Sequence, residues 1–259
     1  MWFFFLRSMK TAMLRLLKPQ PRGNQELILG SRWWWTRKEA QPRDYEVHAA
    51  QAGGSSTANL LQALEEYLPV LLGLVKERGS ELRNKVQFVW SNQEDDAEET
   101  SMADAWYEVL SMLHLMAMVC FLQANSLLLP RSYSDGYGPR VSEESRRATV
   151  DVFLKAAGFL DCAVNQVLLQ IPPEKRRALP VDLAEGNLKA LSLQGLGQGV
   201  DMQLGLAIDN PKATLAVKRR LACELVKYWQ QIKDSIPELP LSDGWAKKKA
   251  HTICKVEVC

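Results

Sequence analysis

The residues best suited to chemistry gather in one acidic run, Glu94, Asp95, Asp96, Glu98 and Glu99. Carboxylate oxygens are the ligands that Mg²⁺ and Ca²⁺ prefer, so this run suggests a metal-dependent enzyme. It lacks the alternating ligand spacing and the turn glycine of a calcium loop. It also precedes a predicted helix, whose amino-terminal dipole is stabilised by nearby carboxylates. We therefore favour a solvated loop, and a helical metal-dependent enzyme using residues 94–99 remains the alternative.

Three alternate glycines, Gly195, Gly197 and Gly199, superficially match a phosphate-binding turn. Such a turn follows a strand and opens a helix, and no strand is predicted before Gly195. The three glycines fall instead inside a helical pattern. We predict that they let neighbouring helices approach closely.

Nucleophiles and metal ligands are otherwise sparse. The chain has only three histidines, and His114 lies on an apolar helical stretch, where we expect a hydrogen-bonded core residue. The five cysteines are dispersed without a CxxC pair, which suits a reducing compartment. No nucleophile–base pair or metal constellation stands out. We predict that the chain is not an enzyme and has no catalytic residue, metal, cofactor or small-molecule substrate. A net charge of +2 also gives no indication of nucleic-acid binding.

Some segments bear on membranes. Residues 2–17 have apolar positions that share one helical face, which would suit a helix on a membrane surface. We favour the alternative prediction, a poorly ordered tail. Residues 109–129 approach the length of a membrane span, but polar side chains interrupt them. We favour a buried helix, with a membrane-anchored helical protein as the alternative. The basic clusters 175–177 and 218–220 are typical of solvated helix surface, although they also suit acidic lipids or peptides.

Apolar residues recur with helical spacing over most of the chain after residue 56. The pattern predicts long helices with short loops containing proline or glycine, at about 57–78, 101–129, 142–170, 182–208 and 211–236. This is an all-α architecture, either an α-solenoid or a bundle.

Details within the helical pattern give further expectations. Asp182 and Glu185 have capping-box spacing, and Asn210 before Pro211 predicts another helix start. Pro69 should kink or split the first helix. Residues 86–90 alternate between buried and exposed types, which predicts at most one short strand or hairpin.

Four stretches, in this order, resemble the BRO domain of Alix-like endosomal sorting proteins, and most closely its plant members. They are Val86-Gln87-Phe88-Val89-Trp90, residues 155–160, residues 181–198 and residues 221–229. The resemblance divides the chain into a poorly ordered or divergent segment at 1–54, a partial BRO-like domain at 55–245 and an unmatched tail at 246–259. BRO domains continue further, so the chain resembles a version shortened at its C-terminus.

The resemblance implies a fold and a function. The fold is an α-solenoid of repeat-like helical hairpins. The function is that of a scaffold in multivesicular body sorting, cytoplasmic and peripherally associated with endosomes. The implied partner is the C-terminal amphipathic helix of an ESCRT-III subunit of the charged multivesicular body type, bound by helix-in-groove recognition. The positions that match the partner-binding site are Met202, Val217, Leu221, Glu143 and Arg147.

Overall fold

The computed structural model describes residues 55–76, 86–91, 99–129 and 141–235. Our expectations for residues 1–54, for the acidic residues 94–98 and for the tail at 246–259 lie outside these ranges.

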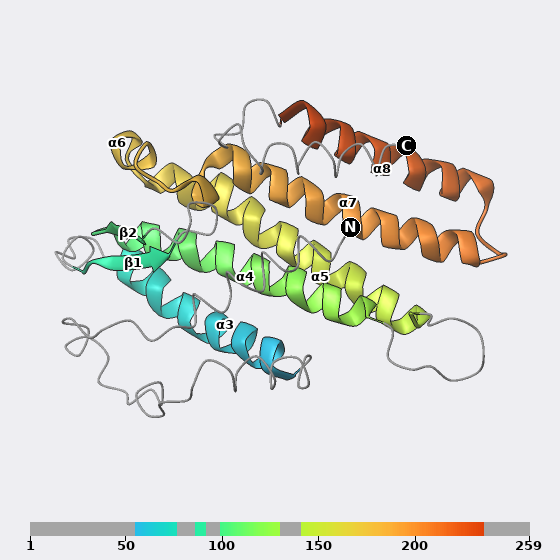
Figure 1. Ribbon diagram of the computed structural model, residues 1–259, viewed down its shortest axis with the longest axis horizontal. Coiled ribbons are helices and arrows are strands. Elements are labelled where there is room, and N and C mark those ends of the chain that lie inside the picture. Colours follow the sequence, from blue (N-terminus) through green and yellow to red (C-terminus); the bar gives the residue numbers. More distant parts are fainter. Residues whose placement is uncertain (1–54, 77–85, 92–98, 130–140, 236–259) are drawn as a thin grey trace.

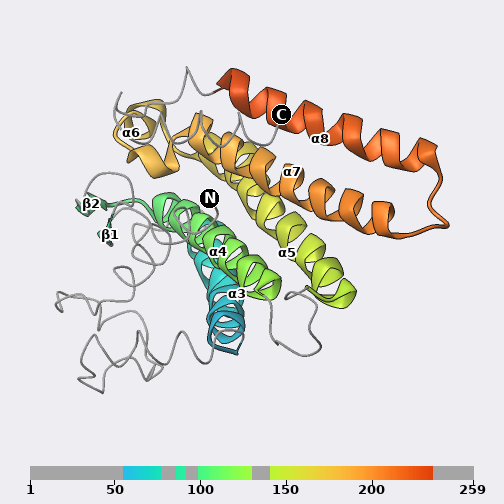
Figure 2. The ribbon, with the colours of Figure 1, turned by 45° about the vertical axis from the view of Figure 1, so that its right-hand side comes forward.

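Five long helices make up most of the described chain. Their bounds are α3 (Ser55–Lys76), α4 (Ala105–Leu128), α5 (Glu143–Cys162), α7 (Glu185–Asp209) and α8 (Leu215–Ser235). Each long helix packs mainly against the next one in chain order, and successive helices run in opposite directions from α3 at one edge to α8 at the other (Figures 1 and 2). The all-α prediction is confirmed, and the neighbour-by-neighbour packing is the order found in a solenoid. Helix α3 runs through Pro69 without a break.

A small hairpin precedes α4. Strand β1 (Phe88–Ser91) pairs antiparallel with β2 (Glu99–Met102), with Phe88 opposite Met102. Of the two alternatives predicted near residues 86–90, the structure has the hairpin, and its second strand covers positions expected to belong to the acidic loop and the start of the next helix. Helix α4 begins later because Asp104 caps it, its Oδ1 accepting a hydrogen bond of 3.0 Å from the Trp106 backbone N–H.

Two predicted caps are wrong. Asp182 lies buried in a 3₁₀ turn (Val181–Leu183), and Ala184, which has no side-chain cap, precedes α7. Asn210 does not start α8, because its Oδ1 accepts a local bond of 2.9 Å from the Lys212 N–H and holds a turn instead. Asparagine favours both local structures, so its sequence position alone does not separate a turn from a cap.

The end of α5 and the link to α7 contain shorter elements. A π-helical turn (Ala163–Val167) and a 3₁₀ turn (Leu168–Gln170) continue α5 to the predicted end at residue 170. A one-turn helix, α6 (Pro173–Arg176), follows where only a break had been expected. Proline at the first helical position explains this, since its missing N–H costs nothing there.

The core lies around α4, which α3 and α5 cover. Its largest fully buried side chains include Tyr107, Leu110 and Met116, and the ring of Phe121 lies 6.1 Å from that of Phe153 on α5. The predicted role in close helix packing is confirmed at Gly195, whereas a Cβ at Gly197 or Gly199 would make only ordinary van der Waals contacts, at 3.5 Å or more. A Cβ at Gly195 would lie 3.2 Å from the backbone oxygen of Phe153, whereas one at Gly197 would meet α8 at Tyr228 and Trp229. Helix α7 thus approaches both neighbours through glycine.

Candidate functional site

The predicted partner-binding residues all lie on α5, α7 and α8. Glu143 and Arg147 lie one turn apart on the first turns of α5, and they pair with each other. Arg147 Nη2 and Nε lie 2.6 and 3.1 Å from Glu143 Oε1, and both side chains are largely exposed. The two opposite charges therefore pair with each other on the surface of α5.

Arg146 joins two of the helices instead. Its Nη1 lies 2.6 Å from Asp209 Oδ2, an ion pair between the start of α5 and the end of α7. Sequence reasoning missed this contact because the partners are 63 positions apart and no local pattern links them. The ion pair holds the start of α5 against the end of α7, close to where the chain continues into α8.

Helix α8 is the edge of the described array, and only Trp229 and Ile232 on it are fully buried. Leu221 is half-buried, whereas Val217 exposes 49% of its surface. The two residues are four positions apart, so they lie on the same flank of α8. This flank lies next to the face of α8 that packs on α7. The flank itself presents apolar side chains to solvent.

Met202 lies elsewhere on the array. It is half-buried and packs against the main core cluster. It follows Gly199 by three residues, so it shares the α5-facing side of α7. The structure therefore brings Val217 and Leu221 together, whereas Met202 is on a different helix and packs toward the core.

The basic cluster at 175–177 is partly structural, contrary to its assignment as solvated surface. Lys175 Nζ lies 2.7 Å from the buried carboxylate of Asp104, and Arg176 Nε donates a 2.7 Å bond to the Ile171 carbonyl. Both contacts hold α6 against the rest of the fold. In the second cluster, by contrast, Arg219 and Arg220 are exposed.

Glu108 and His114 are among the titratable groups buried in α4. Glu108 Oε2 accepts a 2.6 Å bond from the indole Nε1 of Trp90, which ties the hairpin to α4, and burial raises the pKa of Glu108 to about 7. Burial lowers the pKa of His114 to about 4, so this side chain is neutral at pH 7. Neither side chain is open to solvent, which fits roles in the core rather than contact with a substrate.

The metal alternative rests on residues 94–99, of which the structure describes only Glu99, and the membrane alternative rests on long apolar helices. Among the described residues, no three His, Cys, Asp or Glu side chains are grouped to hold a metal ion, and Glu99 is an exposed strand residue. Helices Ala105–Leu128 and Glu143–Gln170 are long and apolar enough to cross a membrane. However, 83% of the most apolar 18-residue stretch of Ala105–Leu128 is buried inside the protein, as expected of a core helix.

Comparisons with known proteins leave the family open. No protein-family model matches the chain, and no curated protein matches it. The resemblance to the BRO domain therefore stays a prediction that rests on the sequence stretches given above.

Proposed function

We propose that the chain is a non-enzymatic adaptor that binds the C-terminal amphipathic helix of an ESCRT-III subunit through the α5–α7–α8 surface. The observation that supports this best is the exposed apolar flank of α8, where Val217 and Leu221 lie side by side. Helix-in-groove recognition uses such residues at helical spacing on a rigid element.

The flank also has charges suited to an amphipathic partner. Arg220 and Glu224 follow Val217 by three and seven positions, so they lie beside it along α8. A helix that docks here needs an apolar stripe for Val217 and Leu221 and polar residues beside it. An amphipathic helix has this arrangement, whereas a uniformly polar segment does not.

The other predicted site residues have smaller roles in this proposal. Glu143 and Arg147 would exchange their mutual bond for bonds to the partner, and exchanging one exposed ion pair for another yields little free energy. Met202 would act indirectly, by fixing the position of α7. Within the cell, the adaptor would work on the cytoplasmic face of endosomes, with at most peripheral membrane contact, in multivesicular body sorting.

Peptide titration tests the proposal. The full chain is titrated calorimetrically with a C-terminal helix peptide of an ESCRT-III subunit and with a scrambled peptide. Leu221→Asp should weaken binding at least about tenfold, as expected on losing an apolar anchor, with an unchanged helical circular dichroism spectrum. If Leu221→Asp unfolds the chain, the exposed position Val217 provides the decisive variant, Val217→Asp. Wild-type affinity in a folded Val217→Asp variant, or equal binding of the scrambled peptide, would reject the proposal.

A further inference from the structure

The turn between α7 and α8 combines exposed apolar and basic side chains. Leu215 exposes 77% of its surface, the most among the large apolar residues that the structure describes, and Ile208 exposes 59%. Pro211, between them, is exposed as well. Exposure of neighbouring apolar side chains to water is unfavourable, so a group of them on the surface indicates an interaction site.

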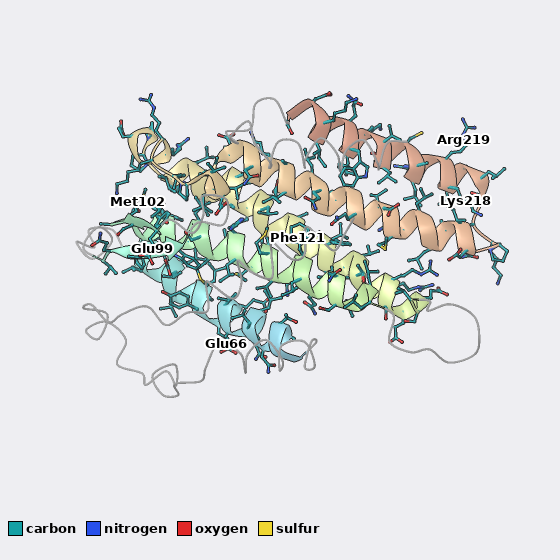
Figure 3. The ribbon with its side chains drawn as sticks, viewed as in Figure 1. Glu66, Glu99, Met102, Phe121, Lys218 and Arg219 are labelled. Atoms are coloured by element: carbon teal, nitrogen blue, oxygen red, sulfur yellow. The ribbon has the colours of Figure 1, made fainter. Side chains whose placement is uncertain are left out.

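Basic residues surround these apolar side chains. Residues 208–220 contain four basic side chains, Lys212, Lys218, Arg219 and Arg220, and one acidic side chain, Asp209. Asp209 is already paired with Arg146 of α5, so it does not neutralise the four cations. Figure 3 shows Lys218 and Arg219 at the end of α8 that adjoins the turn. The surface therefore has a net positive charge around an apolar tip.

The turn is ordered and projects from the array. The Asn210 side chain accepts from the Lys212 N–H, the Ala213 N–H donates to the Asn210 carbonyl at 3.1 Å, and Lys218 Nζ lies 3.4 Å from the Ile208 carbonyl. Figures 1 and 2 both place it at the far end of the α7–α8 pair, beyond the ends of the other described helices. A projecting tip offers little enclosed area to a folded protein, but it reaches a flat surface without obstruction from the other described helices.

We infer that the α7–α8 turn is a contact site for an anionic lipid bilayer, in which Ile208 and Leu215 enter the headgroup region while the neighbouring cations bind lipid phosphates and carboxylates. Apolar insertion combined with attraction of basic residues is the usual basis of peripheral membrane binding. The inference does not depend on the proposed ESCRT-III partner, since its apolar anchors are Ile208 and Leu215 and not Val217 and Leu221; Arg220 belongs to both surfaces.

Vesicle flotation tests this inference with the full chain. The lipids are phosphatidylcholine alone and phosphatidylcholine mixed with phosphatidylserine. We expect binding to the mixed vesicles only, weakened by added salt because salt screens exposed charges. Arg219→Gln and Arg220→Gln should each weaken binding about fivefold, and Ile208→Ser with Leu215→Ser should weaken it at least as much.

The control variants alter α8 far from the turn. Val226→Ser removes an apolar side chain that is 53% exposed, and Lys233→Gln removes an exposed cation. Both should bind vesicles as the wild type does. The inference is overturned if the turn variants bind like these controls, which would assign any membrane contact to another part of the chain such as residues 2–17. Equal binding to both lipid mixtures, or no binding to either, would also overturn it.

Discussion

Helices α4 and α8 have similar lengths but opposite surroundings. In α4, 16 of 24 residues are buried, whereas in α8 only two of 21 are. Helix α4 lies between α3 and α5, while α8 packs on α7 and has no other long helix of the described residues beyond it (Figure 2). In a row of helices, an interior member buries side chains on both sides and contributes stability. An edge member keeps apolar side chains exposed, and these are available to a partner.

The largest expected difference between the interior and the edge of the row of helices is in stability. Phe153 on α5 is 1% exposed and packs against Phe121 of α4, so Phe153→Ala should lower the free energy of unfolding by about 3–5 kcal/mol. Val226→Ala on α8, at a position 53% exposed, should change it by less than about 0.5 kcal/mol. Urea denaturation followed by circular dichroism measures both. Similar losses for the two variants would remove the distinction between interior and edge.

The buried charges of α4 should produce a pH dependence. Folding raises the Glu108 pKa from 4.5 to about 7, so the native state binds this proton more tightly than the unfolded state. The resulting stabilisation is fully present below pH 4.5 and is lost as the pH rises through 7; its size is about 3 kcal/mol. The pKa of His114 moves the other way, from 6.5 to about 4, so its stabilisation is present above pH 6.5 and is lost as the pH falls through 4.

These opposite slopes largely cancel in the wild type, and single variants separate them. Relative to the wild type, Glu108→Gln should become progressively less stable as the pH falls from 7, because it cannot gain the stabilising proton. His114→Leu should show the reverse trend. Free energies of unfolding measured across this pH range provide the test. Parallel curves for the wild type and both variants would show that neither group has a shifted pKa.

Glycine substitutions should show an intermediate effect. A Cβ at Gly195 would lie 3.2 Å from the Phe153 carbonyl oxygen and 3.4 Å from Ala157 Cβ, so Gly195→Ala forces α5 and α7 apart, at a net cost of about 1 kcal/mol. A Cβ at Gly158, on the exposed side of α5, meets nothing within 4 Å. Gly158→Ala should therefore stabilise the chain by up to about 1 kcal/mol through helix propensity. Thermal melts of the two variants should shift in opposite directions, and a stabilised Gly195→Ala variant would contradict the close packing.

The smallest effect is expected at the exposed pair on α5. Glu143→Gln and Arg147→Gln, alone or together, should change the free energy of unfolding by about 0.3–0.5 kcal/mol, because both side chains are solvated. A double-mutant cycle measures the coupling between them. A coupling of several kcal/mol would show that the pair is more than a surface contact.

Local patterns were enough to predict most of the fold. Apolar periodicity gave the long helices, and Ser142, whose side chain accepts a 3.0 Å bond from the Ser145 N–H, marked the start of α5 as expected. Local patterns left open whether a single strand or a hairpin forms near 86–90, because β2 pairs with β1 across eight to fourteen positions. They also missed Arg146–Asp209 and the Trp90–Glu108 bond, since both join distant positions. The placement of Met202 toward the core likewise depends on the helices that pack against α7, which no local pattern specifies.

Site-specific photo-crosslinking can determine whether the Val217 flank of α8 binds the proposed partner helix. Val217 and Val226 are nine positions apart, which places them on opposite sides of α8 with similar exposures of 49% and 53%. A photoreactive phenylalanine analogue is introduced at one position or the other, and the full chain is irradiated with the ESCRT-III helix peptide. Efficient crosslinking is expected from position 217 and background levels from position 226. Crosslinking from 226 alone, equal crosslinking from both positions, or none from either would contradict the proposal.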